Sequence, residues 1–160
     1  MTLEELNGLE PGERGELLHR CNGSAAWVAG MQRVFPVADI AGLLVAAAEV
    51  WRACSEEDWK EAFAHHPKIG VGGGLGKWAS EEQAGTIGAI REVLEDLAEG
   101  NRVYERRFGY IFIVCATGKS AVEMLRLLRE RLGNEPGDEL LIAMQEQEKI
   151  MRIRLEKLLS

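Results

Sequence analysis

Cysteine, histidine and positive charge are all scarce in this sequence of 160 residues. Its three cysteines, Cys21, Cys54 and Cys115, lack the paired spacing of a metal site, and their odd number argues against a disulfide framework. We therefore expect reduced cysteines, used as small apolar residues, in a cytoplasmic protein. Lysine and arginine number 19 against 26 acidic residues, and the net charge of -7 argues against a general nucleic-acid partner.

Long hydrophobic runs are also absent. An apolar stretch such as residues 43–48 is far shorter than the ~20 residues that cross a bilayer. The acidic N-terminal segment has no signal-peptide apolar run, and the C-terminal Leu-Leu-Ser lacks the simple peroxisomal address. The sequence therefore predicts no membrane partner.

The motifs of metal and nucleotide chemistry are incomplete. The three histidines, His19, His65 and His66, include no helical pair at metal-binding spacing. Residues 117–120 resemble the end of a phosphate-binding loop, but Ile113 stands where its first glycine is required. A nucleophile elbow of the serine hydrolases is missing as well. We predict no metal site and no organic cofactor.

Helix signals, by contrast, recur along the whole chain. Serine, threonine or aspartate precedes most segments of helical periodicity, where its side chain can cap the first turn. The predicted helices are a short one after Thr2, one ending near Asn22, one from Ser24 to Phe35, one after Asp39, one after Ser55 that carries Trp59, Phe63 and His66, a long one from Ser80 with a break near Gly100, one from Ser120 to Leu132, and one from Pro136 to Leu159. The apolar run 111–115 has no strand partner, so it predicts a buried extended segment leading to Gly118. The predicted fold class is all-α, a single-domain bundle of residues 1–160 with about seven to nine helices and no substantial sheet.

His66 is the first candidate for chemistry. It follows Phe63 by three residues and Trp59 by seven, so it continues the apolar stripe of its helix at the edge of a glycine-rich loop. Taken alone, this position suits a partly buried histidine that caps the helix slightly better than it suits a catalyst. His65 lies off the stripe and is predicted to face solvent.

Three polar residues on later helices are further candidates. Glu82 and Gln83 lie in a first turn, where an acidic residue favours the helix dipole and a glutamine completes a capping box, so both have a structural explanation. Arg154 interrupts the inward stripe of the last helix, and a buried guanidinium needs a partner. An internal salt bridge or a side chain that extends to solvent explains Arg154 as well as a bound ligand does. The inward positions of that helix are Leu140, Met144, Gln147, Met151, Arg154 and Leu158.

An ordered set of short motifs covers nearly the whole chain. The motifs are His65-His-Pro-Lys-Ile-Gly70, Glu82-Gln83-Ala-Gly85, Asn101-Arg-Val-Tyr104 with Arg107-Phe-Gly-Tyr110, the run 111–118, Arg131-Leu132, and Lys149-Ile150 with Arg154-Leu155. In this order and spacing the chain resembles the 2-oxo-4-hydroxy-4-carboxy-5-ureidoimidazoline (OHCU) decarboxylases. The resemblance implies an all-helical domain and cofactor-free decarboxylation of a small ureide, OHCU, to (S)-allantoin in urate degradation.

The resemblance also implies roles for individual residues. It makes His66 and Glu82 catalytic, and it assigns substrate binding to Pro67, Gln83, Phe112, Ile113, Val114 and Arg154. The family often has a serine at the position that is Ala79 in this chain. Ser80, one residue later, is the candidate to supply the hydroxyl contact instead. A homodimer is compatible with the sequence, although no segment identifies its interface. Two alternatives stay open: a non-catalytic helical interaction module on the same scaffold, and a decarboxylase of a related ureide.

Overall fold

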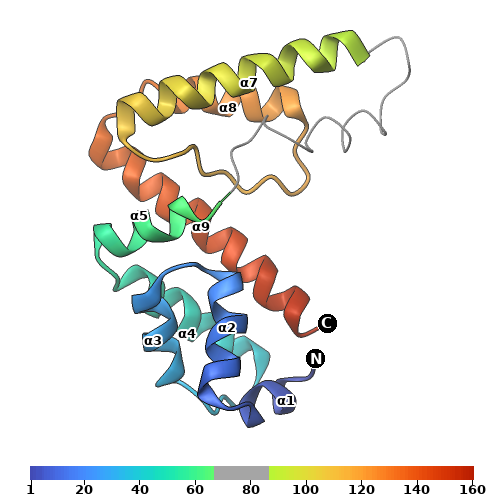
Figure 1. The fold of residues 1–160 in the computed structure, drawn as a ribbon, viewed down its shortest axis with the longest axis vertical. Helices are drawn as coiled ribbons and strands as arrows, with labels where there is room; N and C mark the ends of the chain where they lie inside the picture. Colours follow the sequence, from blue (N-terminus) through green and yellow to red (C-terminus); the bar gives the residue numbers. More distant parts are fainter. Residues whose placement is uncertain (67–86) are drawn as a thin grey trace. The chain divides into compact units, whose positions relative to one another are not determined.

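The computed structural model of the chain describes residues 1–66 and 87–160 (Figure 1). This part of the chain contains eight helices and no assigned strand, which confirms the all-α prediction. It divides into two compact units, Met1–His65 with Met144–Ser160, and His66–Ala143. A single domain over the whole chain stays a prediction. In the residues described, no helix is both long enough and apolar enough to cross a bilayer.

The first unit is built from short helices whose starts are capped by side chains. Thr2, Ser24, Asp39 and Ser55 each accept a hydrogen bond from an amide N–H of the following first turn. Such caps satisfy amide groups that have no partner inside the helix, so the sequence predicted these starts correctly. The helices of this unit are α1 (Leu3–Gly8), α2 (Pro11–Cys21), α3 (Ala25–Gln32), α4 (Ile40–Arg52), α5 (Glu56–Ala64) and residues 144–158 of α9 (Pro136–Leu158).

Two helices of this unit end earlier than predicted. Helix α3 ends at Gln32 instead of Phe35. The N–H groups of Arg33 and Val34 bond to the carbonyl groups three residues earlier, as in a 3₁₀ turn, and not four residues earlier as in an α-helix. Helix α5 ends at Ala64, and His65 has left the helical region with φ -87° and ψ 0°. A residue before proline is disfavoured in the α region, so His66 follows the helix and is not part of it.

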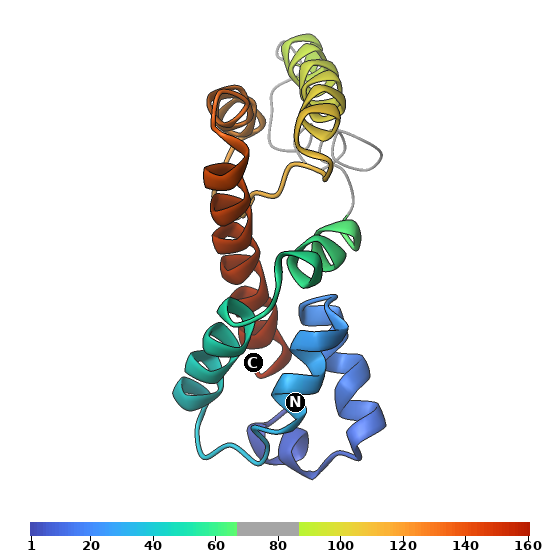
Figure 2. The ribbon, with the colours of Figure 1, turned by 90° about the vertical axis from the view of Figure 1, so that its left-hand side faces the viewer.

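Three tryptophans hold the first unit together. Trp27, Trp51 and Trp59 are buried, and each donates its indole N–H to a backbone carbonyl, at 3.1 Å to Ala47, 3.0 Å to Met144 and 2.9 Å to Trp51 respectively. A buried tryptophan contributes a large apolar surface only if its N–H finds an acceptor. The bond from Trp51 joins α4 to the part of α9 that belongs to this unit, and the two helices lie beside each other in both views (Figures 1 and 2).

The second unit pairs two helices through an extended connection. Helices α7 (Ile87–Phe108) and α8 (Ala121–Arg131) lie side by side and run in the same direction, so the residues between them run back along both (Figure 1). Residues 111–115 of that connection are buried without an assigned strand, and Gly118 has a φ of 76°. This outcome confirms the predicted burial of the segment and its lack of a strand partner. The start predicted for the long helix, at Ser80, lies outside the described residues.

Gly100 was predicted to break α7, and this prediction is wrong. The helix continues through Gly100, where a Cβ atom would clash with Cδ2 of Leu128 on α8. Leu128 is fully buried. The glycine is therefore explained by the close approach of α7 and α8 and not by a break in the helix.

Replacing Gly100 with alanine is expected to destabilise the fold. Forcing a methyl group against Leu128 costs about 1–3 kcal/mol, which exceeds the gain in helix propensity of about 1 kcal/mol. The net change in unfolding free energy is measured by urea unfolding, with circular dichroism as the probe. Gly12→Ala is the matched control, because a Cβ at Gly12 meets nothing within 4 Å, and this variant should be at least as stable as the parent. Equal stability of the two variants would contradict the packing explanation.

Candidate functional site

The predicted site residues are distributed over both units. His66 and the 112–114 segment belong to the second unit, whereas Arg154 belongs to the first. The catalytic roles of His66 and Glu82 and the substrate-binding role of Arg154, which the resemblance implies, stay predictions. Five residues named in the sequence analysis lie outside the described residues: Pro67, Ala79, Ser80, Glu82 and Gln83.

His66 is half-buried, three residues after the fully buried Phe63. A half-buried imidazole can contact the protein on one side and a small molecule on the other. His65 is exposed, as predicted, and its ring packs edge-on against that of His19 with 4.9 Å between the centroids. A Cβ at Gly23 would lie 2.8 Å from the His65 ring, so the end of α5 is held closely against the α2–α3 connection.

Arg154 lies at the end of the inward face of α9. The four earlier inward positions, Leu140, Met144, Gln147 and Met151, are buried, while Arg154 and Leu158 are half-buried, which confirms the predicted face. Nη1 of Arg154 donates to the carbonyl of Arg20 at 3.4 Å, in the last turn of α2. Arg154 therefore brings a positive charge to the place where α2 ends and its carbonyl groups are available.

A buried polar contact accompanies Arg154 on the same face. Gln147 Nε2 donates to Asn22 Oδ1 at 2.9 Å, and Asn22 Nδ2 lies 3.4 Å from the sulfur of Met151. Both amides are fully buried. The pairing explains why a glutamine occupies an inward position, since its amide has a partner that only the folded chain provides. No spacing in the sequence indicates Asn22 as that partner, because the two residues are far apart along the chain.

Cys21 lies within electrostatic reach of Arg154. Burial raises the pKa of the Cys21 thiol to about 11, although the positive charge of Arg154 acts in the opposite direction. The thiol is therefore protonated at neutral pH and is a poor nucleophile. Cys21 is unpaired and buried, in agreement with its predicted use as a small apolar residue.

The segment predicted to contact substrate is held by a buried arginine. Phe112, Ile113 and Val114 are between 2% and 5% exposed. Arg131, at the end of α8, donates from Nη1 to the carbonyl of Ile113 at 2.6 Å, and its guanidinium carbon lies 4.5 Å from the centre of the Phe112 ring. A hydrogen bond and a cation–π contact thus act on two successive residues of the segment.

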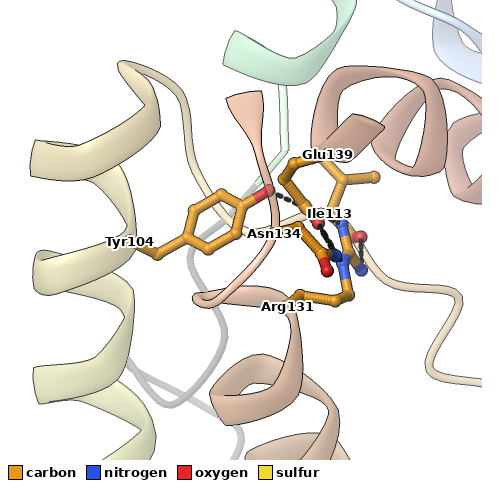
Figure 3. Close-up of polar contacts among 5 residues, drawn as sticks. All are labelled: Tyr104, Ile113, Arg131, Asn134 and Glu139. Carbon is orange, nitrogen blue, oxygen red and sulfur yellow. Dashed lines mark hydrogen bonds and ion pairs between the residues drawn. The ribbon is translucent and has the colours of Figure 1, made fainter. Parts of the chain in front are cut away.

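Arg131 is itself paired with a buried carboxylate (Figure 3). Its Nε and Nη2 donate to Oε2 of Glu139 at 2.9 and 2.6 Å, and the two side chains are 8% and 0% exposed. Glu139 also accepts hydrogen bonds from the hydroxyl of Tyr104 and, at 3.1 Å, from Nδ2 of Asn134. Burial and the hydrogen bond to Glu139 raise the pKa of Tyr104 well above its usual range, so the hydroxyl stays a donor.

Neither Arg131, which is part of a family motif, nor Glu139 is among the predicted site residues. The sequence does contain one indication that Arg131 is buried. Arg131 follows Met124 and Leu128 on the inward face of α8, as Arg154 follows apolar residues on α9. An arginine on such a face needs an acidic partner. Which acid supplies it depends on tertiary structure, and no helical spacing indicated Glu139.

Metal ligands do not gather in the part of the chain that the structure describes. Among residues 1–66 and 87–160, no group of three or more histidine, cysteine, aspartate or glutamate side chains is placed to hold a metal ion. The predicted absence of a metal and of an organic cofactor stays a prediction.

Comparison with known proteins finds relatives among proteins of uric acid degradation. A family model described as OHCU decarboxylase matches residues 7–156. The uric acid degradation bifunctional protein TTL of Arabidopsis thaliana is 35% identical over 148 residues, which are 88% of this chain and 45% of that protein. The uric acid degradation bifunctional protein of Bacillus sp. (strain TB-90) is 27% identical, over 99% of this chain and 32% of its own length.

A solved structure supports the same assignment. The crystal structure of an OHCU decarboxylase in the presence of (S)-allantoin is 35% identical to the chain, with a TM-score of 0.77. The match covers 88% of this chain and 95% of that one. The chain spans less than half the length of the two bifunctional relatives, whereas it corresponds to nearly the whole of the crystallised decarboxylase.

Proposed function

The chain belongs to the OHCU decarboxylase family, and from this premise we propose that it is a carboxy-lyase that converts OHCU to (S)-allantoin in urate degradation. The observation that carries the proposal is the similarity, over 88% of the chain, to a decarboxylase crystallised in the presence of (S)-allantoin. The proposed substrate is a small ureide, and the proposed reaction needs no cofactor. A cytoplasmic location and a homodimeric state stay predictions.

The chemistry of OHCU explains why positioning and proton transfer suffice. The bond between the carboxylate and a hydroxylated ring carbon breaks, CO2 leaves, and the electron pair passes into the adjacent C=N group of the ring. The ring nitrogen takes up a proton, and the hydroxyl group gives up its proton to become the ring carbonyl. A proton then adds to the neighbouring ring carbon, which carries the ureido group, and completes allantoin. The protein contributes an oriented substrate and acid–base groups that work near neutral pH.

Three residues share this work in the proposal. Arg154 binds a carboxylate or ring carbonyl through a directed ion pair, for which a planar guanidinium is well suited. His66, together with Glu82, accepts the hydroxyl proton and returns a proton to one face of the ring. Delivery from one face yields one enantiomer. The half-buried positions of His66 and Arg154 are compatible with these roles.

The direct test of the activity is kinetic. OHCU is generated from urate in situ, and its ultraviolet absorbance is followed with and without the purified chain. We expect the decay rate to rise in proportion to protein concentration. A decay rate equal to that of the spontaneous reaction would show that the chain is not an OHCU decarboxylase.

Arg154→Lys is expected to weaken substrate binding while the fold is retained. Lysine keeps the charge but loses the two-pronged donor, and a hydrogen bond to a charged group contributes about 1.5–3 kcal/mol, so KM should rise about 10- to 100-fold. Arg152→Lys is the control on the same helix, since Arg152 is exposed and pairs with Glu156 at 3.0 Å. Steady-state kinetics of both variants separate KM from kcat. An unchanged KM in Arg154→Lys would remove Arg154 from the binding site.

A further inference from the structure

We propose that Arg131 and Glu139 form a positioning pair that sets the backbone of the 112–114 segment for contact with substrate. This role rests on the proposed function, in which that segment binds the ureide ring. Neither residue needs to touch the substrate, because each acts through the segment. Figure 3 shows the pair between Ile113 and the side chains of Tyr104 and Asn134.

The cost of burying charge argues that the pair does more than fill space. Arg131 and Glu139 are almost completely removed from solvent, at 8% and 0% side-chain exposure. Removing two charges from water costs about as much as their attraction returns, so apolar residues of similar size usually stabilise a core equally well. What apolar residues cannot supply is a hydrogen bond to one chosen backbone group, and Arg131 makes such a bond to Ile113.

The planar guanidinium allows Arg131 to do two things at once. Its Nε and Nη2 face Glu139, and its Nη1 faces the carbonyl of Ile113 at 2.6 Å. The donors of a guanidinium lie in one rigid plane, so fixing two of them on the carboxylate also fixes the direction of the third. The Phe112 ring under the guanidinium adds a second contact to the same segment.

The peptide bond extends this control to a group that can reach a ligand. In a trans peptide the C=O of one residue and the N–H of the next point in opposite directions. The only cis bond in the described residues is Phe35–Pro36, so the Ile113–Val114 peptide is trans. The bond to Ile113 therefore aims the Val114 N–H away from Arg131. Among residues 1–66 and 87–160, no acceptor pairs with this N–H, which suits a carbonyl or carboxylate oxygen of the substrate.

Glu139 is in turn fixed from two further directions. Tyr104 reaches it from α7, and Asn134 reaches it from the α8–α9 connection at 3.1 Å. These two side chains touch Glu139 but make no hydrogen bond to Ile113. They are therefore the natural controls, because they disturb the same cluster without breaking the bond that positions the segment.

The experiment compares Arg131→Lys with Tyr104→Phe by kinetics and by hydrogen–deuterium exchange of residues 111–116. Lysine offers a single nitrogen to Glu139 and Ile113 and lacks the planar fork that fixes the direction of each bond. We therefore expect kcat/KM to fall by about 10- to 100-fold, as for other small displacements of a binding group. Exchange in the 111–116 segment should accelerate in this variant. In Tyr104→Phe, kcat/KM and the exchange rate of residues 111–116 should remain within about twofold of the parent values, since the phenyl ring keeps the aromatic contact with Phe112.

The result that would overturn the proposal is equal behaviour of the two variants in exchange and in kcat/KM. If Arg131→Lys does not fold, the double variant Arg131→Gln with Glu139→Gln replaces it under the same criteria, because it leaves no unpaired buried charge. If the parent itself does not accelerate OHCU decay, the proposed function fails. The exchange comparison then decides the positioning role independently of activity.

Discussion

Replacing His66 with alanine is expected to lower kcat/KM for OHCU by about 10²- to 10⁴-fold, the usual contribution of a general acid–base group. Decarboxylation of OHCU requires a proton to leave a hydroxyl and a proton to reach a ring carbon. An imidazole is suited to both steps because its unperturbed pKa lies near neutral pH. The ultraviolet assay with in situ substrate measures the loss. Far-ultraviolet circular dichroism checks that the helices remain, as expected for a residue that follows the end of α5.

His65→Ala is the adjacent control for this prediction. The His65 ring is exposed and contacts His19, so its removal should change kcat/KM by less than about tenfold. A His66→Ala variant that retains activity within the same range would show that His66 is not the catalytic base. The helix-capping explanation of His66 would then be the better one.

Replacing Glu139 with alanine is expected to cost about 3–5 kcal/mol of unfolding free energy. The substitution leaves the buried guanidinium of Arg131 without its carboxylate, and it also removes the acceptor of Tyr104 and Asn134. Urea unfolding, with the midpoint and the slope fitted separately, measures the change. This loss would be a large part of the stability of a small helical protein.

Glu156→Ala is the control for the stability prediction. Glu156 forms an ion pair with Arg152 in which the side chains are 47% and 64% exposed, so its loss should cost no more than about 1 kcal/mol. A Glu139→Ala variant as stable as Glu156→Ala would contradict the structural role assigned to the buried pair. Both variants remove one glutamate from an ion pair with arginine, so the comparison sets a buried glutamate with further hydrogen-bond donors against an exposed one.

The fold was predictable where local chemistry determines it. The caps at Thr2, Ser24, Asp39 and Ser55 act within one helical turn, and each predicted start is confirmed. Gly100 was misinterpreted because its low helix propensity is local, whereas the reason for the glycine is a contact with another helix. The buried 111–115 segment was recognised from its apolar run, but the donor that holds it was not.

The candidate site was predictable only in part, for the same reason. Arg154 was identified because an arginine stands out on an apolar stripe of its own helix. Arg131 stands out in the same way, yet its partner Glu139 is eight residues away on another helix, where no periodic spacing indicates it. The ordered family motifs supplied the roles of His66 and Glu82, which periodicity alone left open.

The handedness of the product tests the central claim most directly. OHCU prepared in situ from urate is allowed to react with a catalytic amount of the chain, and the circular dichroism of allantoin is recorded as it forms. We predict a signal of (S)-allantoin alone, growing at a rate proportional to protein concentration. Unassisted proton addition occurs on both faces of the ring and gives no net signal. A product without optical activity, formed no faster than in the absence of the chain, would contradict the proposed function.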